Sequence, residues 1–167
     1  MENQQEIIQK IQSEQPELLT SAIQEIKENG DLSMAKLLLE TLPAIQDFHT
    51  KTMLLHLLAD IKENAFKEIV IQQIKATIHT PEVQTDLLRI VWESSLNYSD
   101  YLPLFLDIIQ NGEFTVAFEA STIIENMLHQ LTSEQLHQLN HFIETFSAEK
   151  QFLVENIQTE ITSCEND

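Results

Sequence analysis

The sequence predicts an all-α protein built as an α-solenoid, a stack of short helical hairpins. The tetrapeptide Ile-Lys-Glu-Asn occurs at 26–29 and again at 61–64, 35 residues later. A fixed period in the range of about 20–50 residues is typical of repeat architectures. The 167 residues include only two glycines and four prolines, whereas a β protein of this size needs many turn residues. Leu, Ile, Gln, Glu and Ala are abundant, and most of them favour helices.

Caps, breakers and apolar spacing divide the first half of the chain into five helices. Pro16 suits the first turn of the second helix, and Gly30 follows its end in the manner of a glycine cap. The third helix ends before Pro43. The expected ranges are approximately Asn3–Gln12, Pro16–Glu28, Asp31–Leu42, Asp47–Lys62 and Ala65–Ile78.

Five more helices are expected in the second half. Thr80 and Pro81 begin the sixth, and Thr132 with Gln135 forms a capping box for the ninth. Ser147 is the expected cap of the tenth, which ends near Thr162. The sixth helix is expected to end near Ser95. The seventh is expected to run from Ser99 or Asp100 to about Gly112, and the eighth over approximately Phe114–Leu131.

Ten helices with short connections pair into five antiparallel hairpins. A hairpin of this length cannot bury its apolar face alone, whereas stacked neighbours share a continuous core. We therefore expect one domain over residues 1–162 and a disordered tail at 163–167. The residues expected in the core include Leu54, Leu57, Leu58, Leu87, Leu88, Val91, Phe118, Ile123, Ile124 and Leu153.

The paired helices resemble HEAT or armadillo repeats, as in the segment 101–113 followed by Ala-Phe-Glu-Ala at 117–120. The resemblance extends over nearly the whole chain. It implies a right-handed α-solenoid of about five hairpins, whose second helices line a concave face that holds partners. It implies no chemistry, because a fold alone does not define a function.

Nine basic residues against 27 acidic residues give a formal net charge of −18. Between residues 76 and 149 the only basic residue is Arg89, against 11 carboxylates. Such a surface repels phosphate groups, so we expect binding neither to nucleic acid nor to an anionic membrane.

The single cysteine, Cys164, cannot form an intramolecular disulfide. The start of the chain lacks a signal peptide pattern, and no apolar run reaches the ~20 residues that span a bilayer. We expect a cytoplasmic protein that is a monomer or a weak homodimer.

Aligning the second helices places one carboxylate at a recurring position in four hairpins. The members of this acidic ladder are Glu25, Asp60, Glu93 and Glu125. Equivalent positions in stacked helices lie ~10 Å apart, so the ladder forms one acidic strip that attracts Lys/Arg-rich segments. The alternative is that these residues are solvated positions on the surface of an acidic protein.

Two aromatic residues near the ladder are candidate partner contacts. Trp92 precedes Glu93, and an aromatic ring beside carboxylates suits recognition of a cationic side chain. The alignment of Trp92 with Ala59 and Ile124 instead favours packing of its ring in the core, which leaves Tyr98 as the exposed aromatic residue. Glu119 follows an apolar run and is expected either to be partly buried or to bridge helices.

No catalytic or metal-binding pattern is found in the sequence. His137 and His141 share a helix face, but a structural zinc ion needs four ligands, and no third ligand converges on them. Two glycines cannot build a nucleotide-binding loop of the usual kind, and no serine lies in a nucleophile motif. We expect no enzymatic activity, no cofactor and no metal ion.

The interpretation that follows is a non-catalytic scaffold that binds a basic protein or peptide in an acidic concave groove. A small HEAT-like enzyme is the alternative, because DNA glycosylases and pigment lyases with such repeats exist. The acidic charge argues against a glycosylase, which needs a basic groove, and a lyase needs an apolar cleft and a partner subunit. Self-association through an end hairpin is a third possibility.

Overall fold

The computed structural model describes residues 4–13, 15–147 and 150–164, and these residues form helices and no strand. The α-helices in this part of the chain are α1 (Gln4–Gln12), α2 (Pro16–Asn29), α3 (Leu32–Thr41), α4 (Phe48–Ala59), α5 (Ala65–Ala76), α6 (Pro81–Glu93), α7 (Leu102–Asn111), α8 (Phe114–Met127), α9 (Ser133–Thr145) and α10 (Phe152–Cys164). Short 3₁₀ helices occur at η1 (Leu42–Ala44), η2 (Ser99–Tyr101) and η3 (Leu128–Gln130). The all-α class is therefore confirmed for the described residues.

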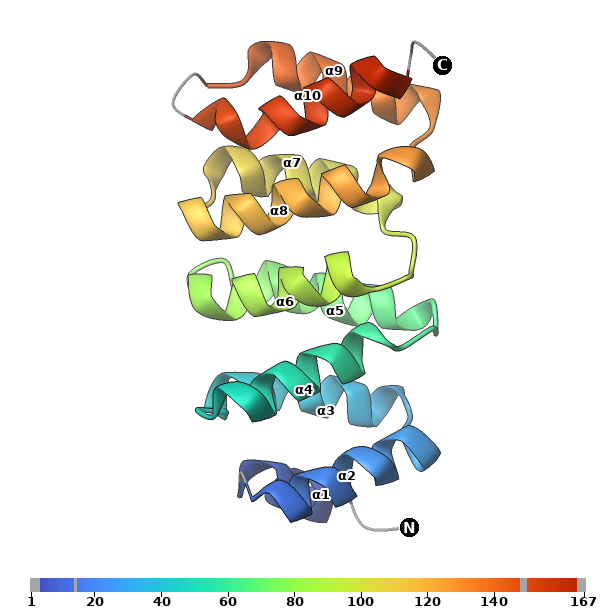
Figure 1. The fold of residues 1–167 in the computed structure, drawn as a ribbon, viewed down its shortest axis with the longest axis vertical. Helices are drawn as coiled ribbons and strands as arrows, with labels where there is room; N and C mark the ends of the chain where they lie inside the picture. The colour runs from blue at the N-terminus through green and yellow to red at the C-terminus, as the bar shows by residue number, and fades with distance from the viewer. Residues whose placement is uncertain (1–3, 14, 148–149, 165–167) are drawn as a thin grey trace.

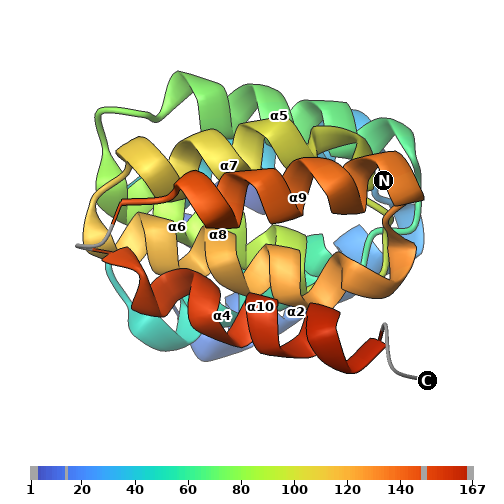
Figure 2. The ribbon, with the colours of Figure 1, turned by 90° about the horizontal axis from the view of Figure 1, so that it is seen from above.

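Consecutive helices pair, and the five pairs stack along the long axis of the molecule (Figure 1). The second helices of the pairs, α2, α4, α6, α8 and α10, form one layer, and the first helices form the other. Seen along the stack, α6 and α8 are set back from α4 and α10 (Figure 2). We call the outer side of the layer of second helices the second-helix face.

The predicted caps account for several helix starts. Asp31 accepts a hydrogen bond from the Met34 N–H at 2.9 Å, and Asp47 accepts one from the Thr50 N–H at 2.7 Å. These bonds satisfy backbone donors that have no partner inside the helix. The capping box of α9 is also formed as predicted, by Thr132 and its N3 residue.

Gly30 and Gly112 follow helices for a reason that differs from the predicted one. Both have extended backbone, with φ of −68° and −73°, so neither is in the left-handed conformation of a glycine cap. A Cβ atom at Gly112 would lie 2.5 Å from the Ile108 carbonyl oxygen, and one at Gly30 would clash with the Ile26 carbonyl oxygen. Glycine is needed here because the chain passes too close to the helix end for a side chain.

Several helices are shorter than predicted. Helix α4 ends at Ala59. Helix α8 ends at Met127, and the 3₁₀ helix η3 continues the chain from there. α10 begins at Phe152, several residues after the expected cap at Ser147, whose carbonyl accepts the Lys150 N–H. α10 also extends to Cys164, so of the predicted tail at 163–167 only residues 165–167 lie outside the described residues.

One continuous apolar core runs through all five pairs. The residues predicted to lie in the core are buried, with the exception of Phe118. Phe118 was predicted wrongly: 52% of its surface is exposed, because it lies on the outer side of α8, one turn after Phe114. No helix in the described part of the chain combines the length and the apolar content needed to cross a bilayer.

Candidate functional site: the second-helix face

The members of the acidic ladder all lie in the layer of second helices, toward the C-terminal end of each helix. Glu25 is on α2, Asp60 caps the end of α4, and Glu93 is the last residue of α6. Glu125 is on α8, in the last turn of the helix. Because the second helices run in the same direction through the stack, these ends lie at the same edge of the molecule (Figure 1).

The four carboxylates differ in how far their charge is compensated. Glu93 accepts a hydrogen bond from Arg89 Nε at 2.7 Å, and His56 Nε2 lies 3.6 Å from its other oxygen. Glu25 accepts only the neutral Asn29 amide, at 3.2 Å. Asp60 is exposed to solvent. The ladder therefore has a partly neutralised member at its centre.

Glu125 identifies a fifth member of the ladder that the sequence analysis missed. Burial raises the pKa of the Glu125 carboxyl, the negative charge of Glu160 raises it further, and a hydrogen bond with Asn156 lowers it. Glu160 and Asn156 belong to α10, which covers this side of α8. Glu160 follows Glu125 by 35 residues, the same spacing as between Glu25 and Asp60, so extending the period would have found it.

Trp92 connects two hairpins. Its indole N–H donates to Glu119 Oε2 at 2.6 Å, which joins α6 to α8. The ring is half-buried and packs against the core, in agreement with the core interpretation. This hydrogen bond confirms one of the two roles predicted for Glu119, that of a bridge between helices.

Tyr98 was predicted to be exposed, and this prediction is wrong. Only 2% of its surface is accessible, because the connection between α6 and α7 folds its ring into the space between α6 and α8. Burial raises the pKa of its hydroxyl. Tyr98 therefore packs inside the protein, where its ring cannot contact a partner.

Most basic residues of the chain are occupied in joining its own elements. Lys51 pairs with Asp86 at 3.1 Å, and Lys62 donates to Ser95 Oγ at 2.8 Å. Lys150 Nζ donates to the Gly112 carbonyl at 2.7 Å and also reaches the last carbonyls of α7. By contrast, none of the carboxylates on α8, α9 and α10 forms an ion pair within the described part of the chain. The exposed carboxylates of α9 and α10, Glu134, Glu144, Glu155 and Glu160, therefore face solvent without a paired cation in the described structure.

Three exposed aromatic rings lie together where α8 and α10 begin. Phe114, Phe118 and Phe152 are 57%, 52% and 49% exposed. The ring centroid of Phe114 lies 6.4 Å from that of Phe118 and 5.7 Å from that of Phe152. We call these three residues the phenylalanine patch. Large exposed apolar residues that touch one another are more informative than a single one.

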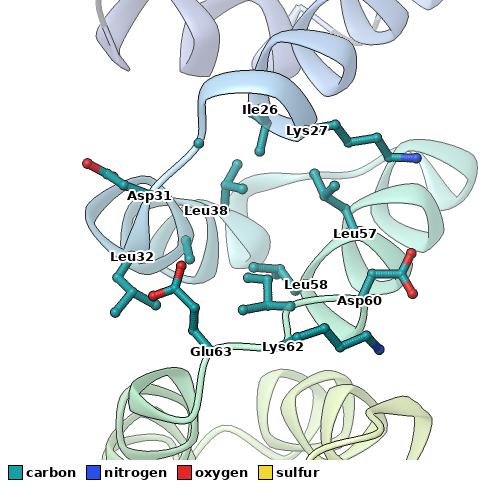
Figure 3. A pocket seen from close by; sticks show the side chains of 13 residues that line it. Ile26, Lys27, Asp31, Leu32, Leu38, Leu57, Leu58, Asp60, Lys62 and Glu63 are labelled. Carbon is teal, nitrogen blue, oxygen red and sulfur yellow. The ribbon is translucent and has the colours of Figure 1, made fainter.

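A cavity of about 450 Å³ opens between the first two hairpins. We call it the α2–α4 pocket. Its apolar wall includes Leu38, Leu57 and Leu58, and charged side chains surround the opening (Figure 3). Both copies of the repeated tetrapeptide contribute, through Ile26, Lys27, Ile61, Lys62 and Glu63.

The polar contacts at this junction differ from those at the next one. At the next junction Lys62 reaches Ser95, the residue 33 positions later, and other side-chain contacts also join α4 to α6. At the first junction the equivalent residues are Lys27 and Lys62, and the carboxylate of Asp60 lies on the same side of the pocket (Figure 3). Within the part of the chain that the structure describes, no hydrogen bond or ion pair joins α2 to α4.

The described residues contain no group of three or more His, Cys, Asp or Glu side chains placed to hold a metal ion. His137 and His141 are exposed on α9. Comparison with protein-family models, with curated protein sequences and with solved structures gave no significant match.

Proposed function

We propose that this protein is a non-catalytic scaffold of the HEAT/armadillo kind, a right-handed α-solenoid that binds a basic protein or peptide on its second-helix face. The observation that carries the proposal is the distribution of charge. Most cations contact other parts of the chain, whereas the exposed carboxylates Glu155 and Glu160 of α10 form no ion pair in the described structure, and Glu155 lies one turn after the exposed Phe152.

The chemistry of the face suits recognition of cations. A strip of carboxylates raises the local concentration of a basic partner and speeds its association. Within this strip Glu93 contributes least, because Arg89 already compensates its charge. Glu155 and Glu160 contribute more, since both are exposed and neither forms an ion pair in the described structure. Asp60 is exposed beside Lys27 and Lys62 at the α2–α4 pocket, and Glu125 is partly buried. The proposed binding region is therefore the acidic ladder extended to α10, with Trp92 beside it and without Tyr98.

The test is capture of a partner from native lysate, followed by binding measurements with that purified partner. The variant Glu155→Lys/Glu160→Lys reverses two exposed charges on the second-helix face. The control variant Glu134→Lys/Glu144→Lys makes the same change of charge on α9, in the opposite layer. We expect the α10 variant to weaken binding strongly and the α9 variant to weaken it slightly, through net charge only.

Binding should also weaken as the salt concentration rises, because solvent-exposed charges are screened. Equal losses in the two variants would mean that net charge alone attracts the partner, and the proposed face would be wrong. Unchanged binding in both variants would exclude electrostatic recognition altogether. Circular dichroism of each variant verifies that the helices are intact.

A further inference from the structure

We propose that the phenylalanine patch is the anchoring point for the partner, and that it accepts the apolar side of an amphipathic segment rich in Lys and Arg. This inference rests on the proposed function, since it names the contact that such a partner makes. The patch gathers Phe114, Phe118 and Phe152 from the N-terminal ends of α8 and α10, which lie one above the other in the stack (Figure 1).

The rings form a joined surface. Phe114 lies at the centre and contacts both other rings, so residues from two hairpins contribute to one apolar area. Each of the three residues is about half exposed, and the rings lie against one another. Aromatic side chains that are partly held in place lose little conformational freedom on binding, and they dominate many interfaces.

The charges around the patch select the partner. Glu113 precedes Phe114, Glu119 follows Phe118, and Glu155 lies one turn after Phe152. Glu113 and Glu155 are exposed, while Glu119 holds Trp92. The nearest cation along the chain, Lys150, is turned toward the carbonyl groups that end α7. An apolar area surrounded by carboxylates fits a segment with apolar side chains flanked by Lys or Arg.

The same charges disfavour a second copy of this chain as the occupant. Two chains with a formal net charge of −18 each repel one another, and both would bring carboxylates to the shared contact. An anionic membrane is disfavoured for the same reason. A basic amphipathic segment is the occupant that satisfies both the rings and the charges.

The chain carries its own probe for this contact. Trp92 is the only tryptophan, and its indole N–H is bonded to Glu119, which is next to Phe118. A segment that covers Phe118 is expected to alter the surroundings of this bond. The emission of Trp92 should then report binding of any peptide that lacks tryptophan.

The experiment titrates the full chain with a synthetic helical peptide that has Leu on one face and Lys on the other. Two comparison peptides replace every Leu by Ser, or every Lys by Gln. We expect a change in Trp92 emission with the Leu/Lys peptide, and affinities weaker by about tenfold or more with either comparison peptide.

Phe118→Ser should weaken binding of the Leu/Lys peptide by about tenfold or more. Phe48→Ser is the matched control, because Phe48 is 79% exposed at the start of α4 and lies outside the patch. The control should bind within about twofold of the original chain. Calorimetric titration gives the same affinities without relying on Trp92.

Three outcomes would overturn the inference. If Phe118→Ser binds like the original chain while Glu155→Lys/Glu160→Lys does not, the proposed function stands and the patch is not the anchor. If neither variant weakens binding, or the original chain does not bind the peptide, both proposals fail. If Phe118→Ser abolishes a concentration-dependent dimer seen by sedimentation, the patch joins two copies of this chain.

Discussion

Tyr101 donates its hydroxyl to Glu68 Oε1 at 2.6 Å, and the two residues are separated by 33 positions. The same separation recurs between Lys62 and Ser95 and between His56 and Arg89. This separation is close to the 35 residues between the two copies of the Ile-Lys-Glu-Asn tetrapeptide, so the side-chain contacts between hairpins follow nearly the same period as the sequence. Each contact joins equivalent places in neighbouring units, as expected for a stack in which every unit touches only the next.

Tyr101 should ionise at unusually high pH. The hydrogen bond to Glu68, together with smaller contributions from burial and from the negative charges of Glu68 and Asp100, raises its pKa from 10.0 to about 12. The folded state then keeps a proton that the unfolded chain has lost. The bond's contribution to stability should be fully present below pH 10.0 and lost as the pH rises to about 12.

The phenolate absorbance measures this directly, since the chain has only two tyrosines. In the variant Tyr98→Phe the signal belongs to Tyr101 alone. Adding Glu68→Gln should bring the Tyr101 titration back toward its ordinary pKa. An unchanged titration in the double variant, with circular dichroism showing folded protein throughout, would contradict the role of Glu68.

Leu88→Ala should lower the free energy of unfolding by about 2–5 kcal/mol, because Leu88 is fully buried and its removal leaves a cavity. Phe118→Ala removes a larger side chain from the surface and should cost less than about 1 kcal/mol. Urea denaturation followed by circular dichroism compares the two variants. A cost for Phe118→Ala equal to that for Leu88→Ala would mean that Phe118 belongs to the core.

Ala35→Met should stabilise the fold by about 0.5–2 kcal/mol, because Ala35 lines the α2–α4 pocket and a longer side chain can fill apolar space there. Ala120→Met is the matched control. Ala120 is fully buried away from this pocket, and extra volume at that position should cost about 1–3 kcal/mol. Thermal melting of both variants provides the comparison, and destabilisation by Ala35→Met would show that the pocket is too small or too polar for the added chain.

Lys150→Met should lower the free energy of unfolding by about 1–2 kcal/mol. The ammonium group donates to carbonyl groups that end α7, where a positive charge also interacts favourably with the helix dipole. Lys36→Met is the control, because Lys36 is exposed on α3 and has no such contact. Chemical denaturation measures the free energy of unfolding of both variants. An equal decrease in the two variants would contradict the capping role of Lys150.

The sequence was sufficient to predict the helical class and most helix starts, since caps such as Asp31 and Thr132 act locally. It did not predict the exposure of Phe118 or the burial of Tyr98. Phe118 lies in an apolar run that surrounds the whole helix, so periodicity could not separate its inner side from its outer side. Tyr98 lies in a connection whose path depends on tertiary packing, and its burial leaves no pattern in the sequence.

The candidate site was predicted in part. The positions of Glu25, Asp60, Glu93 and Glu125 on one layer followed from the repeat period, whereas the pairing of Glu93 with Arg89 and His56 depends on side-chain geometry. Glu160 could have been found by continuing the period. The phenylalanine patch joins residues far apart in sequence, and no local signal marks it.

The junction between α2 and α4 is also expected to yield first when the stack is stretched. Force applied along the long axis should separate the first hairpin from the second before the second from the third, because several polar contacts join α4 and Lys62 to the next hairpin, whereas none joins α2 to α4 in the described structure. Single-molecule stretching should therefore show a small early extension followed by a larger, later one. A mechanical load at the N-terminal end would widen the α2–α4 pocket while the acidic and aromatic surface of α8 and α10 kept its shape.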